Sequence, residues 1–238
     1  MMIIKSCYGV DLKEITEKKH TLFLGISLGN RYFTTQNILH YIHWMVENSR
    51  SKVGVMIVDE IHAINLEVYD RIPYDEALKR ALELGVKVET ELKEAIHEHQ
   101  LKERVHLFRW RDIKDEKYFE QLGVLEEAFN ENSTFREAII RYVKTGIGPE
   151  RRKILVEGDA ERLSRYLLEE VAACINGIRV MESVYTAFPY PGKGVSQLFY
   201  DIQYGEAYEF LRKKLKIDKY IASIEMYCEE GEKNESSR

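Results

Sequence analysis

The sequence predicts an α/β fold built on a mostly parallel, doubly wound sheet, and three observations lead to this prediction. Short apolar runs typical of buried strands alternate with longer segments of helical periodicity. The chain has 238 residues, which is enough to bury a sizeable core. Hydrophobic residues make up 45% of it and only four residues are proline, a composition typical of globular proteins.

The predicted elements follow one another along the chain. Five apolar runs predict strands, over residues 22–27, 53–60, 104–110, 178–185 and 219–227. Apolar residues at helical spacing predict helices over 34–49, 74–99, 115–130, 134–145 and 159–176. Proline and glycine mark a loop at 188–194, before another helix. No repeat or linker divides the chain, so we expect a single domain over 1–228 and a polar tail over 229–238.

Charge and cysteine content limit the classes of function. The formal net charge is −5 and the pI is about 5.9, so a general nucleic-acid coat is not expected, although a local basic patch is compatible with these values. The three cysteines are far apart without a CxxC pair, which predicts reduced thiols and no metal site. No segment approaches the ~18 consecutive apolar residues of a membrane span. We therefore expect a cytoplasmic protein that does not enter a membrane.

The first predicted strand ends in Ser27, between Gly25 and Gly29. Ligands of doubly wound sheets bind outside the carboxyl ends of the strands, so Ser27 is well placed for chemistry. One interpretation is a plain strand-to-helix turn in which Ser27 caps the next helix. Another is a serine esterase, because the stretch fits the G-x-S-x-G pattern. That fold needs a histidine late in the chain, and all seven histidines lie within the first 106 residues.

A second group of residues lies on the predicted helix 159–176. Tyr166 and Glu170 are four residues apart and share one helix face, with apolar neighbours. A half-buried carboxylate needs a cation, which the ammonium group of a substrate would supply. The alternative is an ordinary helix whose Glu170 pairs with a surface Arg or Lys.

Together these stretches resemble the cyclodipeptide synthases. That family has an H-x-[LVI]-[LVI]-G-[LVI]-S motif, and this chain has "HTLFLGIS" with one extra residue before the glycine. The family's Y-[LVI]-x-x-E-x-P motif resembles "YLLEEVA", where Ala172 replaces the usual proline. The downstream tyrosine of the family looks like Tyr185, followed here by Thr186 where some members have histidine. Asn30, three residues past Ser27, and Tyr118 also fit the family.

The resemblance implies a Rossmann-like fold similar to class I aminoacyl-tRNA synthetase catalytic domains. It also implies that two aminoacyl-tRNAs become a cyclic dipeptide, a diketopiperazine, without ATP or another cofactor. Ser27 would carry an aminoacyl-enzyme and then a dipeptidyl-enzyme, in a ping-pong reaction. Glu170 would hold the α-ammonium, with Tyr166 beside it. Tyr185 would relay a proton or orient the intermediate, unless it packs in the core.

Two further sets of residues are expected to meet the substrate. By the resemblance, Phe23, Met56 and Trp110 look like the pocket of the first amino acid, with core packing as the alternative, and Gly25, Asn30 and Tyr118 complete the substrate-binding set. Basic residues are candidates for tRNA contact or are simply solvated: Lys79, Arg80, Lys87, Arg151, Arg152 and Lys153. A non-catalytic tRNA- or nucleotide-binding Rossmann-like module is the remaining alternative. The joined amino acids and the oligomeric state are not predicted.

Overall fold

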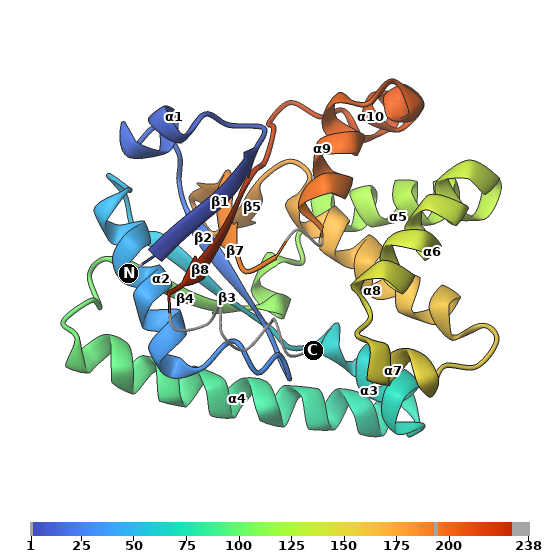
Figure 1. The fold of residues 1–238 in the computed structure, drawn as a ribbon, viewed down its shortest axis with the longest axis horizontal. Helices are drawn as coiled ribbons and strands as arrows, with labels where there is room; N and C mark the ends of the chain where they lie inside the picture. Colours follow the sequence, from blue (N-terminus) through green and yellow to red (C-terminus); the bar gives the residue numbers. More distant parts are fainter. Residues whose placement is uncertain (1, 193–194, 230–238) are drawn as a thin grey trace.

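The structure is a computed structural model that describes residues 2–192 and 195–229. Its sheet has two three-stranded parts (Figure 1). One part is parallel throughout and consists of β2 (Phe23–Ser27), β3 (Val53–Val58) and β4 (Val105–Arg109). In the other part β8 (Ala222–Cys228) runs parallel to β7 (Ala187–Tyr190) and antiparallel to β1 (Met2–Tyr8). A parallel bridge between Leu22 and Ala187 joins the parts, so the strand order is β1-β8-β7-β2-β3-β4.

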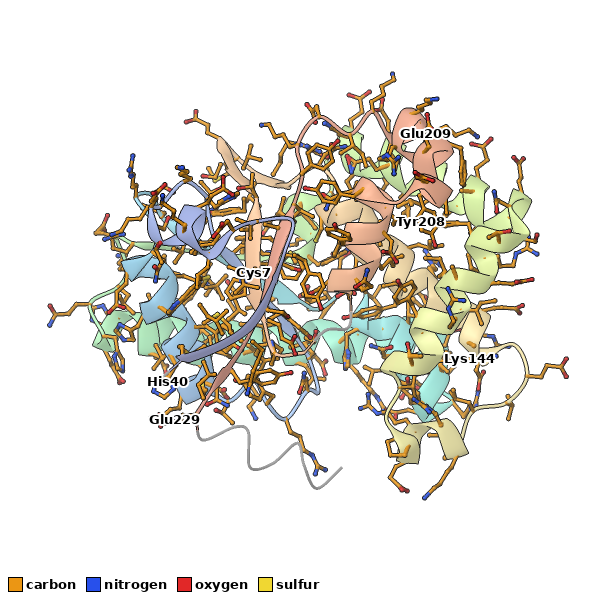
Figure 2. All side chains as sticks on the ribbon, turned by 45° about the horizontal axis from the view of Figure 1, so that its top comes forward. Cys7, His40, Lys144, Tyr208, Glu209 and Glu229 are labelled. Carbon is orange, nitrogen blue, oxygen red and sulfur yellow. The ribbon has the colours of Figure 1, made fainter. Side chains whose placement is uncertain are left out.

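Different helices cover the two faces of this sheet, as the doubly wound prediction requires. Side chains alternate along a strand, so Leu24 and Ile57 point to one face while Phe23 and Met56 point to the other. The first face packs against α2 (Thr35–Glu47) and α4 (Tyr74–Glu98). The second face packs against a larger helical layer: α5 (Glu116–Glu131), α6 (Ser133–Gly146), α8 (Asp159–Cys174), α9 (Ser196–Tyr204) and α10 (Glu209–Leu215). In Figure 2, Cys7 and His40 mark the sheet side, whereas Lys144 and Tyr208 mark the helical side.

Several short elements complete the chain, and the sequence patterns did not predict them as separate elements. They are α1 (Leu12–Thr16), α3 (His62–Asp70), α7 (Pro149–Lys153), β5 (Ile178–Val180), β6 (Ser183–Tyr185) and the 3₁₀ turns Trp110–Ile113 and Glu206–Tyr208. The predicted strand 178–185 is in fact an antiparallel hairpin of β5 and β6, because Met181 reverses the chain at a φ of 53°. The predicted loop 188–194 begins inside β7. Of the tail predicted for 229–238, only Glu229 lies within the described residues.

A buried ion pair fixes α4 against the sheet. Asp59, which follows β3, is 1% exposed and accepts a hydrogen bond of 2.6 Å from Nε of Arg109 at the end of β4. Arg109 also donates to the carbonyl of Leu82 on α4 at 3.1 Å. A Cβ on Gly85 of α4 would lie 2.6 Å from the Asp59 carboxylate. Because only glycine permits this approach, Gly85 allows α4 to lie against the carboxyl ends of β3 and β4.

Across residues 2–192 and 195–229, none of the helices combines the length and the apolar character that a membrane span requires.

Candidate active site

The serine turn leaves the carboxyl end of β2. Ser27 is the last residue of that strand, and the N–H of Asn30 donates back to its carbonyl at 3.3 Å. Gly29 has a φ of +74°, which a side chain rarely adopts, and a Cβ there would lie 3.4 Å from the His62 ring. The turn is therefore tight, and it holds the Ser27 hydroxyl at the edge of the sheet.

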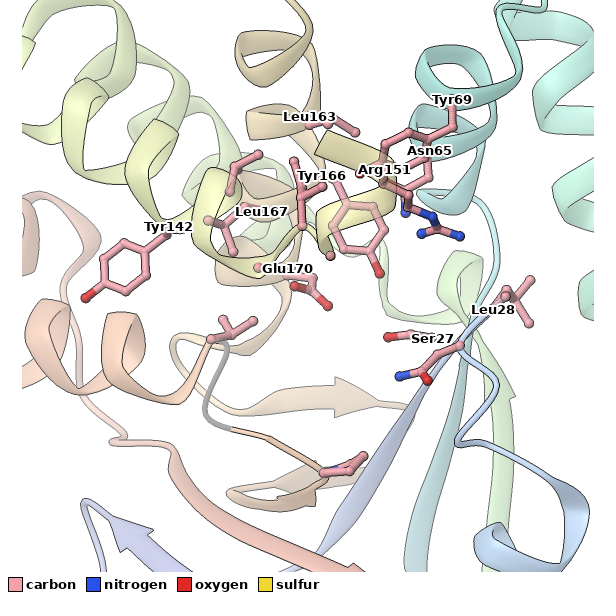
Figure 3. Close-up of a pocket in the computed structure, with 18 of the residues that line it drawn as sticks. Ser27, Leu28, Asn65, Tyr69, Tyr142, Arg151, Leu163, Tyr166, Leu167 and Glu170 are labelled. Carbon is pink, nitrogen blue, oxygen red and sulfur yellow. The ribbon is translucent and has the colours of Figure 1, made fainter. Parts of the chain in front are cut away.

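Helix α8 lies opposite this serine and carries Tyr166 and Glu170, the two residues that the sequence predicted for the site. Tyr166 and Glu170 are one turn apart, and their polar groups point toward Ser27 from the helical side (Figure 3). The helix begins after Gly158 and buries Leu163, Leu167 and other apolar side chains against the helical layer. The amphipathic pattern that predicted the helix thus also determines which of its residues face the sheet.

Tyr190, at the end of β7, completes the group. Its hydroxyl lies 2.9 Å from Oγ of Ser27, within hydrogen-bond distance. Asn30 also hydrogen-bonds the Tyr190 hydroxyl, and the Phe33 ring packs against the tyrosine ring with centroids 5.6 Å apart. Because β7 and β2 end at the same edge of the sheet, the two hydroxyls meet there.

Burial raises the pKa of three groups around Ser27: Glu170, Tyr190 and Tyr166. It raises the pKa of the Glu170 carboxyl to about 7, an effect that a hydrogen bond with Tyr166 partly offsets. Burial and the nearby Glu170 raise the pKa of Tyr190 to about 12 and that of Tyr166 well above its usual value. Both phenols are therefore neutral hydrogen-bonding groups at neutral pH, whereas Glu170 exchanges a proton in the physiological range.

These groups lie in a cavity of about 940 Å³ between the sheet edge and the helical layer. Ser27, Tyr166, Glu170 and Tyr190 are among its polar lining residues. Its remaining wall is mostly apolar, including Val143, Ile147, Leu163, Leu167, Val195 and Leu198. None of the described residues that line the cavity is a histidine, so they do not supply the base of a Ser-His-Asp triad. The esterase interpretation therefore has no structural support.

The structure corrects the expectation for Tyr185. Its side chain is 1% exposed and stacks on Phe108 with ring centroids 5.8 Å apart. Its hydroxyl lies 3.1 Å from Nδ1 of His106, and it does not line the cavity. Tyr190 occupies the position beside Ser27 that was expected for Tyr185. The signal was present in "FPYPGKG", where a tyrosine ends an apolar run, but the prolines led to a loop interpretation.

The three residues expected in the first amino-acid pocket, and Tyr118 of the wider substrate-binding set, lie in the main core, which was the alternative given for the pocket residues. Phe23, Met56, Trp110 and Tyr118 are each 3% exposed or less and belong to one packed cluster. None of them lines the cavity around Ser27. Tyr118 donates a hydrogen bond to Glu169 on α8, and Trp110 packs edge-on against its ring. Gly25 remains half-buried, and a Cβ there would make only ordinary contacts with Val58 and Met56.

The basic residues expected at the tRNA fall into two groups. On α4, Arg80 pairs with Glu76, and Lys87 lies 4.0 Å from Glu91. These ion pairs and the many acids of α4 leave no strong basic stripe that includes Lys79. On α7 the three cations, Arg151, Arg152 and Lys153, make different contacts.

Of those three α7 cations, Arg152 donates to the carbonyl of Ile147 at 2.8 Å, and Lys153 pairs with Glu150 at 2.6 Å. Arg151 lines the cavity and lies over the Tyr69 ring, 4.7 Å from its centroid. Sequence reasoning also missed several polar residues of the cavity wall, among them Arg31, Asn65 and Tyr69. Arg31 follows the serine turn, and its position alone could have indicated it. The other two come from α3, which was not predicted.

No group of three or more His, Cys, Asp or Glu side chains within residues 2–192 and 195–229 is arranged to hold a metal ion.

Comparison with known proteins gives the family of the chain. The family model "Cyclodipeptide synthase" matches residues 6–201. The chain belongs to the cyclodipeptide synthase family. Members of this family are aminoacyltransferases that form cyclic dipeptides from aminoacyl-tRNAs, so the chain is such an enzyme with aminoacyl-tRNA as its partner. The serine turn and most of α9 lie inside the matched region. A comparison with curated protein sequences gives no significant match.

Solved structures of cyclodipeptide synthases share the fold at low sequence identity. One from Bacillus thermoamylovorans is 16% identical, with a TM-score of 0.72 and coverage of 90% of this chain and 91% of that one. One from Mycobacterium tuberculosis, described as related to type I tRNA synthetases, is 15% identical, with a TM-score of 0.70 and coverage of 90% and 87%. One from Candidatus Glomeribacter gigasporarum, bound to Phe-tRNAPhe, is 21% identical, with a TM-score of 0.58 and coverage of 86% of both chains. The Rossmann-like fold expected from the sequence is confirmed.

Proposed function

We propose that this cyclodipeptide synthase works by a ping-pong mechanism in which Ser27 carries both covalent intermediates. The observation that carries the proposal is the position of the Ser27 hydroxyl, 2.9 Å from the Tyr190 hydroxyl and facing Glu170 across a cavity. A serine that only capped a helix would not need two tyrosines and a carboxyl group around its hydroxyl. The cavity of about 940 Å³ has room for an aminoacyl group and a terminal nucleoside.

The first half-reaction transfers one aminoacyl group to the enzyme. Oγ of Ser27 attacks the ester carbon of the first aminoacyl-tRNA, and the bond between that carbon and the ribose oxygen breaks. The serine proton passes to the ribose oxygen, and Tyr190 is the nearest hydroxyl that can relay it. An ester is already activated, so this step needs no ATP and no cofactor. In this scheme, backbone N–H groups of the turn at Leu28 and Gly29 donate to the oxyanion.

The second half-reaction builds the dipeptide and closes the ring. The amine of the Ser27-bound residue attacks the ester carbon of a second aminoacyl-tRNA, forming the peptide bond and releasing the second tRNA. The new terminal amine then attacks the ester carbon on Ser27. Oγ leaves and regains a proton, so that the free enzyme and a diketopiperazine result.

Glu170 has two tasks in this scheme. Its carboxylate holds the α-ammonium of the Ser27-bound residue, with Tyr166 hydrogen-bonded beside it. Because burial raises its pKa to about 7, the same carboxylate is basic enough to take a proton from that ammonium before the amine attacks. A carboxyl group with an ordinary pKa would be a poorer acceptor at neutral pH.

The remaining substrate-binding assignments rest on position. Gly25 leaves space on the strand that carries Ser27, and Asn30 holds the Tyr190 hydroxyl.

We place the reaction in the cytoplasm, where aminoacyl-tRNAs are made, and assign it to a single catalytic domain over residues 1–228. The identity of the two amino acids is left open.

The experiment is mass spectrometry of the intact protein after mixing with a pool of aminoacyl-tRNAs, followed by peptide mapping. We expect an aminoacyl adduct on Ser27 and, with time, a cyclic dipeptide in solution. A cyclic dipeptide that forms without any adduct on Ser27 would contradict the covalent mechanism. An adduct on Ser27 that never becomes a dipeptide would contradict the second half-reaction.

A further inference from the structure

Two arginines that have no carboxylate partner stand at the cavity that contains Ser27. Arg31 and Arg151 both line this cavity and are both exposed to solvent. Within the described part of the chain, neither is paired with an Asp or Glu, whereas the nearby cations Lys153 and Arg71 are. The chain carries a net charge of −5, so two free cations at the opening of one cavity have the opposite sign to the chain as a whole.

The local charge balance at the opening is positive. Glu150 also lines the cavity, but its carboxylate is 2.6 Å from Nζ of Lys153 and is neutralised by that cation. Glu170 lies deeper, and burial raises the pKa of its carboxyl to about 7, which lowers its average negative charge. Burial and the positive charge of Arg151 lower the pKa of the neighbouring His62 to about 4, so this imidazole is neutral. The opening therefore carries two cations that form no ion pair with an Asp or Glu of the described residues.

The two arginines lie on opposite walls of the cavity. Arg31 belongs to the turn after β2, four residues past the proposed nucleophile, on the sheet side. Arg151 belongs to α7, on the helical side, where its guanidinium lies over the Tyr69 ring (Figure 3). That contact and a hydrogen bond with Tyr69 hold the guanidinium in place, and most of its five N–H donors remain available for a ligand. The α7 helix is itself anchored, because Arg71 donates to the carbonyl of Ile154 and pairs with Asp159.

We infer that Arg31 and Arg151 bind the phosphate that precedes the 3′-terminal nucleoside of the incoming aminoacyl-tRNA, and so position its ester at Ser27. The inference rests on the proposed function, because it assumes that the ester is attacked in this cavity. The aminoacyl ester is carried by the terminal ribose, and the 5′ phosphate of that nucleoside is the nearest anion of the tRNA. When the ester reaches Ser27, this phosphate is brought to the cavity opening. Arginine suits the task, because its planar fork binds phosphate oxygens in pairs.

The test measures binding of the trinucleotide CpCpA, the 3′ end of tRNA, and of the same trinucleotide with uncharged methylphosphonate links. Neither probe carries an amino acid, so the result does not depend on which amino acids the enzyme joins. We expect the wild type to bind the charged probe about tenfold more tightly at low salt, with a preference that shrinks as salt rises. Arg31→Gln and Arg151→Gln should each reduce this preference, and the double variant should lose most of it.

Lys213→Gln provides a control with the same change of charge on α10, where Lys213 pairs with Glu209. It should bind both probes as the wild type does, and thermal melting should show that all variants are folded. The inference is overturned if the double variant keeps the wild-type preference, or if the wild type has none. Acylation of Ser27 by a small activated amino-acid ester, which has no phosphate, tests the proposed function separately. It should be unchanged in the double variant, and its absence in the wild type would refute the proposed function alone.

Discussion

The hydroxyl of Tyr118 donates a hydrogen bond of 3.0 Å to the carboxylate of Glu169, the residue next to Glu170. Glu169 is 6% exposed and also accepts a hydrogen bond from Arg165 at 3.2 Å. The bond between α5 and α8 fixes the rotation of α8 about its axis. That rotation decides whether Tyr166 and Glu170 face the serine turn, so Tyr118 supports the site from outside the cavity.

Tyr118→Phe should therefore destabilise the protein by about 1–3 kcal/mol, because a buried carboxylate loses a hydrogen-bond donor. Urea unfolding followed by circular dichroism gives the change in the free energy of unfolding. Tyr200→Phe is the control, since Tyr200 is 41% exposed, and it should change stability by less than about 0.5 kcal/mol. Equal effects of the two substitutions would show that the bond to Glu169 adds nothing.

Ser27→Ala should abolish cyclic dipeptide formation and leave the protein folded. The substitution removes one oxygen at the edge of the cavity, so its effect on the melting temperature should be small. Mass spectrometry of the medium after expression in bacteria measures the product. Ser133→Ala at the start of α6 is the matched control and should preserve the yield. Undiminished product from the Ser27 variant would remove Ser27 from the mechanism.

Dipeptide formation should depend on the ionisation of Glu170. The carboxylate is the active form and the pKa of this group is about 7, so the rate should rise roughly tenfold between pH 6 and pH 8. Glu170→Gln should leave a low rate that does not change over this range. Affinity for tRNA, measured at one salt concentration, should be nearly unchanged in the variant. If affinity and rate fell together, Glu170 would be a structural or RNA-facing residue instead.

The ionisation of Glu170 should also make the free energy of unfolding depend on pH. Burial raises its pKa in the folded protein, so the protonated form is favoured there, and the resulting stabilisation is lost as the pH rises toward about 7. The free energy of unfolding of the wild type, relative to Glu170→Gln, should therefore fall between pH 5 and pH 7.5. Urea unfolding of both proteins at each pH measures the difference. A difference that does not vary with pH would mean that the carboxyl group titrates normally.

Tyr190→Phe and Tyr185→Phe should have different effects on catalysis. Tyr190 hydrogen-bonds the proposed nucleophile, so its loss should slow acylation of Ser27 by about tenfold to a hundredfold. Tyr185 contacts His106 in the core, so its substitution should affect stability more than acylation. Single-turnover acylation with aminoacyl-tRNA compares the two. A larger loss of rate in the Tyr185 variant would restore that residue to the catalytic role expected from the sequence.

Gly85→Ala should destabilise the protein by about 2–4 kcal/mol. The new Cβ would lie 2.6 Å from the Asp59 carboxylate and 3.0 Å from the Arg109 guanidinium, and would force this buried ion pair apart. Gly123→Ala on α5 is the control, because nothing lies within 4 Å of a Cβ there. That substitution should stabilise the helix by about 0.5–1 kcal/mol. Thermal unfolding of both variants distinguishes a packing requirement from helix propensity.

The sequence predicted the parallel part of the fold well, because continuous apolar runs and long amphipathic helices are strong signals. The predicted helix 74–99 corresponds to α4 (Tyr74–Glu98), and the predicted strand 53–60 contains β3 (Val53–Val58). β1 was missed, because residues such as Lys5 and Ser6 interrupt its apolar pattern. An edge strand with one pairing partner needs less apolar sequence than a central one.

The site was predicted in part for similar reasons. Ser27, Tyr166 and Glu170 lie near one another because each sits at a regular position of a strand or helix. Tyr185 and Tyr190 could not be told apart, since both are strand tyrosines of the same short segment and only the turn between β6 and β7 decides which faces the serine. In the same way, the sequence could not show which of the three cations Arg151, Arg152 and Lys153 lines the cavity. Which of three adjacent cations turns inward depends on backbone carbonyls and acids that lie elsewhere in the fold.

The single bridge between Leu22 and Ala187 has a mechanical consequence. Ser27 belongs to one half of the sheet and Tyr190 to the other, and among the described residues no ladder of strand pairs continues from this bridge toward the two hydroxyls. The separation of the two hydroxyls therefore depends on how the side chains of the two halves pack, for example on the contact between Phe23 and Phe188. We expect substitutions in β1 or β8 that alter this packing to change the reactivity of Ser27, although every residue around it stays the same.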